Sequence, residues 1–173
     1  LHQFQQPSVA VFKLANGIEV YLVERHNLPT ASLDLTFEGG LANDPPGKEG
    51  LASLCMDLVT EGTEKLAKVA FEEAKADLAS DVGSYASADQ QGVSMSSLTK
   101  NLDATLDLWA DSILHPGLRQ EDFDRLVKDR LEGLAQTKAA APSIASRLAR
   151  SIVWGAAHPL GRVVTEQSTQ SLT

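Results

Sequence analysis

The sequence has one cysteine, no excess of positive charge and no long apolar run, and each shortage excludes a class of protein. With a single cysteine, Cys55, the chain can have neither an internal disulfide framework nor a Cys-x-x-Cys pair for zinc or redox chemistry. The formal net charge of −8 argues against binding to nucleic acid or an anionic bilayer, because both attract positive protein surfaces. No apolar run reaches the roughly 18 residues that suggest a membrane span, so we predict no membrane insertion.

The chain of 173 residues is 43% hydrophobic and 22% charged, which is typical of an ordinary globular domain. Its length predicts one domain. The sequence begins at Leu1 without a methionine or a secretory n-region, and it ends in polar residues that can cap a further helix. We therefore expect residues 1–173 to be a piece of a longer chain, with any targeting signal upstream.

Three segments near the start have the alternating pattern of strands, beginning at Val9, Ile18 and Ala31. The tripeptide ANG at 15–17 predicts a hairpin turn between the first two. Further along, residues 81–98 predict two more strands joined by a polar turn around Gln90 to Gly92. A mostly antiparallel sheet is the expected result.

Helical periodicity begins at "GLASLCMDLVTEGT" (50–63), where apolar residues fall at helical spacing. The expected buried stripe includes Cys55, which we predict to be a buried, inert thiol, and Gly62 is the expected stop. Other helices are predicted near 66–78, 99–114, 123–140 and after Pro142. Strands and helices in this order indicate an α+β domain with helices packed on the sheet.

Several short segments are similar to one known family: "GG" (39–40), "DPPGKEGLA" (44–52), "EGT" (61–63), "NLDATLDLWADSILHP" (101–116) and "HPLGR" (158–162). In this order and spacing, the chain resembles the N-terminal domain of the pitrilysin/insulinase zinc peptidases, the inverzincins. That family includes bacterial two-subunit peptidases and the mitochondrial processing peptidase. The resemblance implies a metallopeptidase-homologue domain of the LuxS/processing-peptidase type, here a single domain of a longer two-domain chain.

The reactive motif of the family is H-x-x-E-H, on the helix that opens with "GLA". Histidines at i and i+4 share a helix face and hold zinc, while the glutamate serves as general base. The resemblance places the two histidine positions on Ser53 and Asp57 and the glutamate position on Met56. A thioether cannot accept a proton, so Met56 cannot replace the base.

The third zinc ligand of the family is a glutamate on a later helix, and the resemblance places it on Gly133, with a supporting glutamate position on Leu126. A one-residue shift would bring Glu132 into register. We predict that the chain binds no zinc and has no catalytic residues of its own. Ser53 and Asp57 are then polar positions on a core helix, and Gly133 permits close packing against that helix.

The remaining charged and polar candidates are expected to be structural. His2, His26, His115 and His158 do not stand at ligand spacing, and we predict turn or surface roles for them. The doublets 24–25 and 129–130 are expected to be solvated surface charge.

The resemblance also implies a peptide that adds to a sheet edge through backbone hydrogen bonds. The matching segment is 83–89, with Ser84, Tyr85, Ala86 and Ser87 as candidate peptide contacts. A plain hairpin strand is the alternative.

Three functions follow from these expectations. The first is a non-catalytic homologue that clamps a peptide substrate as the partner of a catalytic subunit with an intact H-x-x-E-H motif. The second is an active peptidase with an unusual metal held by Asp57 and Glu132. The third is a purely structural, core-type subunit of a larger complex. Resemblance to bacterial two-subunit members implies the periplasm or cell envelope.

Overall fold

The computed structural model describes residues 7–172, and these divide into two compact units at Thr30 and Ala31. The first unit is a hairpin of β1 (Ala10–Lys13) and β2 (Glu19–Leu22), paired antiparallel. Gly17, at φ 90°, lies in the connecting turn, and its amide donates to the Leu14 carbonyl. The predicted hairpin is confirmed.

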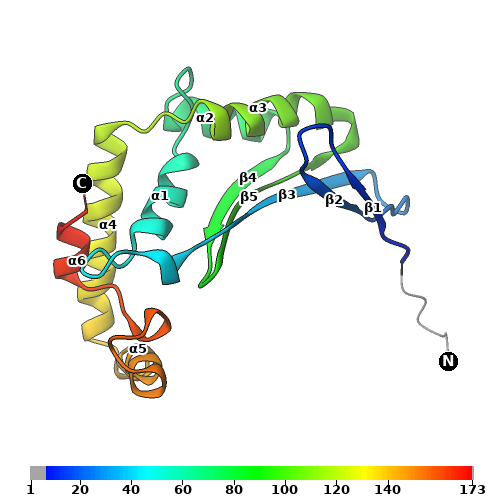
Figure 1. Ribbon diagram of the computed structural model, residues 1–173. Helices are drawn as coiled ribbons and strands as arrows, with labels where there is room; N and C mark the ends of the chain where they lie inside the picture. The colour runs from blue at the N-terminus through cyan, green and yellow to red at the C-terminus, as the bar shows by residue number, and fades with distance from the viewer. Residues whose placement is uncertain (1–6, 173) are drawn as a thin grey trace. The chain divides into compact units, whose positions relative to one another are not determined.

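The second unit contains a three-stranded sheet in the order β3-β5-β4, made of β3 (Thr30–Glu38), β4 (Asp81–Ala86) and β5 (Gln90–Leu98) (Figure 1). β4 and β5 pair antiparallel. The predicted turn at Gln90 to Gly92 is wrong, since the strands are joined by residues 87–89. Ser87 closes this turn by donating its amide to the Gln90 carbonyl, and its hydroxyl accepts from the Gln90 amide.

Gly92 lies inside β5 instead of in the turn, opposite Tyr85 of β4. A Cβ atom at Gly92 would stand 2.7 Å from the Tyr85 hydroxyl oxygen and equally close to the Leu35 carbonyl oxygen. Glycine is therefore required because the Tyr85 ring passes over this position.

Six α-helices and three short 3₁₀ helices complete the described part of the second unit. They are α1 (Leu51–Val59), α2 (Lys68–Asp77), α3 (Leu102–Leu114), α4 (Gln120–Lys138), α5 (Ala141–Trp154), α6 (Glu166–Gln170), η1 (Leu41–Asn43), η2 (Thr99–Asn101) and η3 (Pro159–Gly161). The sequence pattern did not predict α6. This short helix begins at a capping box in which the Thr165 hydroxyl accepts from the Ser168 amide.

The main core lies where α1, α2 and α3 pack on one face of β4 and β5. Its buried members are Met56, Phe71, Val82, Val93, Met95 and Leu108. An antiparallel strand pair covered by helices on its apolar face is the expected α+β architecture, so the predicted fold class is confirmed.

The expected burial of Cys55 is wrong, because this side chain is exposed. The buried residues of α1 are Leu54, 2% exposed, and Met56, 7% exposed. α1 contacts β4, β5, η1 and α4, so it is covered on several sides and its inward positions do not form the single stripe that its apolar residues suggest.

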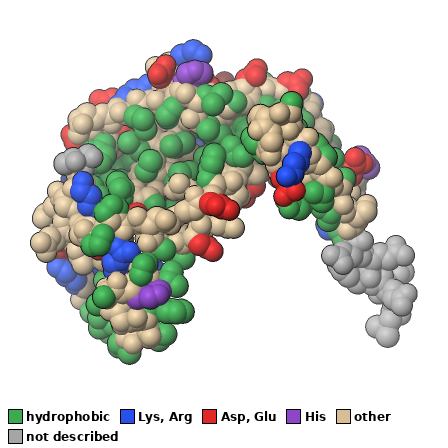
Figure 2. Space-filling view, in the orientation of Figure 1, with side chains coloured by type: hydrophobic (Ala, Val, Ile, Leu, Met, Phe, Trp, Pro, Cys, Tyr) green, Lys and Arg blue, Asp and Glu red, His purple; other side chains and the backbone are tan. Residues whose placement is uncertain are grey.

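Hydrophobic side chains gather over α5, at the lower end of the view in Figure 2. Ile152, Val153 and Trp154 are 79%, 74% and 52% exposed. In the described part of the chain, no helix is long and apolar enough to cross a membrane.

Candidate functional site

The start of α1 is built on Gly50 and Asp44. Gly50 has φ 97°, a left-handed conformation that glycine adopts without strain. The buried Asp44 carboxylate accepts from the amides of Gly50 and Ala52 at 2.7 and 2.9 Å. These bonds satisfy two amides at the helix N-terminus and fix the direction in which α1 leaves the loop.

Ser53, at the first motif position, is half-buried on α1. Its hydroxyl donates to the Gly50 carbonyl at 3.0 Å. A hydroxyl turned back to its own helix backbone is a common local bond for serine. Ser53 is therefore part of the helix start.

Met56, at the position of the general base, points inward. It belongs to the main core and is 7% exposed. Its backbone carbonyl accepts from the Ser84 hydroxyl at 2.7 Å, which joins α1 to β4. The side chain fills apolar volume and has no group that can take a proton.

Asp57, at the last motif position, is half exposed and forms an ion pair with Arg130 of α4 at 3.0 Å. The other terminal nitrogen of Arg130 donates to the Gly50 carbonyl at 2.7 Å. Only 16% of the Arg130 side chain is exposed. The prediction that residues 129–130 are solvated surface charge is therefore wrong for Arg130, because a partner distant in sequence covers it.

The α4 positions do not add a ligand. Gly133 is exposed, and a Cβ atom there would meet nothing within 4 Å, so the expected close packing at Gly133 is wrong. Leu126 is half-buried and apolar. Glu132 is 61% exposed and lies 3.9 Å from Lys128 on its own helix. A shift in register therefore gives no second carboxylate beside Asp57.

The residues present do not fit the zinc ion that the resemblance implies. Ser53 donates its proton to a carbonyl, Met56 is buried in the core, and Asp57 already neutralises a guanidinium. Within residues 7–172, no three His, Cys, Asp or Glu side chains are grouped to hold a metal ion. Three strong ligands are the usual minimum for catalytic zinc, and this face has one paired carboxylate.

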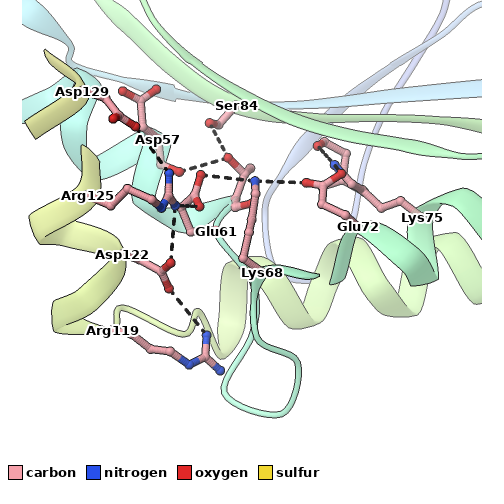
Figure 3. A network of polar contacts seen from close by, with 12 residues as sticks. Asp57, Glu61, Lys68, Glu72, Lys75, Ser84, Arg119, Asp122, Arg125 and Asp129 are labelled. Carbon is pink, nitrogen blue, oxygen red and sulfur yellow. Dashed lines mark hydrogen bonds and ion pairs between the residues drawn. The ribbon is translucent and has the colours of Figure 1, made fainter. Parts of the chain in front are cut away.

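A charged network lies at the other end of α1, around Glu61 (Figure 3). The Glu61 side chain is 11% exposed and accepts from Arg125 of α4 and, at 3.2 Å, from Lys68 of α2. Arg125 also contacts the buried Asp122 at 3.4 Å. The network thus joins the end of α1 to two other helices.

Lys68 and Glu72 extend this network along α2, 3.0 Å apart, and Lys75 reaches Glu72 at 2.8 Å. Burial favours the neutral forms of Lys68 and Glu72, but hydrogen bonds between opposite charges outweigh it. The pKa of Lys68 is raised by Glu72 and Glu61, and the pKa of Glu72 is lowered by Lys75 and Lys68. Lys68 and Glu72 therefore both stay charged near neutral pH.

β4 lies at one edge of the described three-stranded sheet. Ser87 donates to Gln90, and the strands continue from there in unbroken antiparallel register. Bonded and non-bonded pairs alternate along such a ladder, so the backbone groups of Ser84 and Ala86 point away from β5. These two residues offer N–H and C=O groups to an added strand.

The side chains of the candidate peptide contacts point to different neighbours. Ser84 contacts α1 through the Met56 carbonyl and Thr60. Tyr85 bonds with the Thr36 hydroxyl of β3 at 2.9 Å. Ser87 stabilises the turn. The outward backbone groups of Ser84 and Ala86, more than these side chains, are therefore available for recognition, whereas the Ser87 carbonyl already accepts from the Leu41 amide at 2.9 Å.

A cleft of about 600 Å³ adjoins the end of β4 and the start of α1. Ser87 and Gly50 line it on one side, and Arg147, Arg150 and Trp154 of α5 line it on the other. The sequence pattern did not indicate this cleft, because the residues named on its two sides are 60 to 104 residues apart along the chain.

The described histidines have local roles. His115 lies 3.0 Å from Asp111 and is 54% exposed, and His26 lies 3.4 Å from Glu24 in the first unit. The His158 ring accepts from the Leu160 amide and stacks on Trp154. Turn and surface roles are confirmed for these three, while His2 lies outside the described residues.

The family model described as Insulinase (Peptidase family M16) matches residues 19–162. The fold is similar to the crystal structure of a peptidase M16 inactive domain from Pseudomonas fluorescens, with a TM-score of 0.87 and 24% identity over 96% of this chain and 41% of that one. It is also similar to a protease from Helicobacter pylori, with a TM-score of 0.81 and 20% identity over 97% of this chain and 41% of that one. The chain thus spans under half the length of both. Comparison with curated proteins gives no match.

Proposed function

Because the chain belongs to the insulinase family of peptidases, peptidase family M16, we propose that it is a non-catalytic member that holds a peptide for a catalytic partner subunit. The partner is a homologue with an intact H-x-x-E-H motif. The observation that carries the proposal is Met56: the position of the general base is occupied by a core thioether. The Pseudomonas fluorescens relative, described as an inactive domain, supports this role.

Peptide binding is supported by the outward backbone groups of Ser84 and Ala86 on the β4 edge. An extended peptide recognises such an edge through main-chain hydrogen bonds and needs no catalytic group. The cleft beside Ser87 is lined by three arginines and two acidic residues, and this excess of positive charge favours acidic groups on the peptide. An extended, acidic peptide is the expected ligand.

The peptide site is tested by two variants at one position. Ala86→Pro removes an outward N–H without removing a bond to β5, whereas Ala86→Gly keeps that N–H and loses only a methyl group. Titration of fluorescent acidic peptides should show binding to the natural protein and to Ala86→Gly, with about tenfold weaker binding to Ala86→Pro, the cost of about one hydrogen bond. Equal affinity of both variants would remove β4 as the site.

The partner role is supported by the exposed apolar side chains of α5, because such a patch is typical of an association surface. Ile152→Asp should weaken co-purification with a catalytic homologue from the same genome. Val69→Asp is the matched control, since Val69 of α2 is also exposed, at 70%. Equal loss in both variants, or in neither, argues against α5 as the partner surface.

Peptide cleavage by the pair and by each protein alone tests the whole proposal. We expect the pair to cleave faster than the catalytic member alone and this protein alone to be inactive. Cleavage by this protein alone, abolished by Asp57→Ala, would establish the active-enzyme alternative. A pair no faster than its catalytic member would leave a structural subunit as the better description.

A further inference from the structure

Arg130 of α4 binds a neighbouring helix, whereas charged side chains on a helix surface usually face water. Its guanidinium crosses from α4 to α1 and binds there at two points, the Gly50 carbonyl at 2.7 Å and the Asp57 carboxylate at 3.0 Å. With 16% of the side chain exposed, it is mostly removed from water. Such burial of a cation requires compensating acceptors, and α1 supplies both.

The contact covers the face of α1 that carries two of the motif positions. Gly50, Ser53 and Asp57 are spaced at i, i+3 and i+7, so they lie on one side of the helix. The guanidinium binds the first and the last, and the Ser53 hydroxyl donates to the same Gly50 carbonyl. Arg130 therefore spans the surface on which a metal ion would be held.

The α4 end of the contact lies in the same region. Gly133, at the position of the family's third zinc ligand, is one turn beyond Arg130 on the same helix. In this chain a side-chain cation thus extends from α4 to the motif face of α1. A metal ion brought to this face would be repelled by the guanidinium and would have to compete with it for Asp57.

We propose that Arg130 is a built-in cation that replaces the metal, joining α1 to α4 and excluding a metal ion from the motif face. Restoring the three zinc ligands is therefore not enough for metal binding as long as Arg130 is present. This role of Arg130 is independent of peptide binding, since Arg130 is not on the β4 edge.

Exclusion of the metal ion is tested by restoring the zinc ligands both with Arg130 in place and with Arg130 replaced. The variant Ser53→His/Asp57→His/Gly133→Glu supplies three zinc ligands and keeps Met56, which avoids burying a carboxylate in the core. A second variant adds Arg130→Met, and a control adds Lys128→Met, which removes an exposed cation from the same helix. Zinc binding is measured by calorimetry and by metal content after dialysis.

We expect zinc to bind at least about tenfold more tightly when Arg130 is replaced, because the repulsion is then removed. The Lys128→Met control should bind no better than the three-ligand variant. Equal zinc binding with and without Arg130 would overturn the proposal, and so would failure of zinc to bind in both backgrounds.

The joining role is tested in the natural sequence. Arg130→Met should lower the thermal midpoint by several degrees, whereas Lys128→Met should leave it nearly unchanged. Asp57→Asn combined with Arg130→Met should cost less than the sum of the single changes, because the two side chains contact each other. An unchanged midpoint in Arg130→Met would contradict this role.

Discussion

Two ion-paired carboxylates near the C-terminal end of α1 join it to α4, and they differ in burial and in partners. On the motif face, the half-exposed Asp57 pairs with Arg130. Beyond the helix end, the buried Glu61 carboxylate is held by Arg125 and Lys68 together. An exposed carboxylate can be replaced at low cost, whereas a buried one with two partners cannot. The zinc-ligand positions on α1 can therefore be replaced while the Glu61 network that joins the helices is kept.

Met56, which precedes Asp57 on α1 and enters the main core, gives the largest expected effect. Met56→Glu restores the side chain of the general base but places a carboxylate in the main core, and we expect a loss of about 3 kcal/mol in the free energy of unfolding. Met56→Leu, a change of similar volume, should cost less than about 1.5 kcal/mol. Urea denaturation measures both. A stable Met56→Glu variant would show that this position opens to water.

Glu61→Gln tests the buried ion pair. It removes the negative charge that Arg125 and Lys68 share, and it should cost about 2 kcal/mol, because charged hydrogen bonds are lost and both cations remain. Chemical denaturation gives the value, with the exposed Glu64→Gln as control. A loss no larger than that of the control would mean that burial adds nothing here.

Asp57→Asn tests the half-exposed ion pair. We expect a loss of about 1 kcal/mol, because the Asp57 carboxylate is half in water and Arg130 keeps its bond to the Gly50 carbonyl. The loss should shrink when salt is added. If Asp57→Asn costs as much as Glu61→Gln, the contrast between the two ion pairs is wrong.

Gly133→Ala should stabilise the protein by about 0.5 kcal/mol, because alanine favours a helix interior and a Cβ atom there meets nothing. Thermal unfolding measures the rise. A fall in stability would show that Gly133 packs against something in solution.

Glu72→Gln should give the smallest effect at neutral pH and a clear dependence on pH. The pKa of Glu72 is lowered from 4.5 in the folded state, so its contribution is present above pH 4.5 and is lost as the pH falls through the folded pKa. The difference between Glu72→Gln and the natural protein should therefore disappear in acid. Unfolding measured from pH 7 to pH 3 tests this, and a constant difference would contradict it.

Much of the fold followed from local patterns. The hairpin turn at Gly17, the alternation of β3 and the apolar periodicity of α3 each depend on neighbours in sequence, and each was predicted. The errors occurred where distant segments meet: Gly92 serves the Tyr85 ring instead of a turn, and Cys55 lies on an exposed side of α1. Periodicity shows that a helix has an apolar face, but it does not show how many neighbours cover it.

The absence of histidine and glutamate from the motif helix is evident from the sequence, since Ser53, Met56 and Asp57 are read directly from it. The tertiary structure alone decided what these residues do instead. Met56 enters the core, Ser53 bonds to the helix start, and Asp57 meets Arg130, which is 73 residues away along the chain. The physical reason is that ion pairing and burial depend on distance in space, and no local pattern around Arg130 marks it as the partner of Asp57.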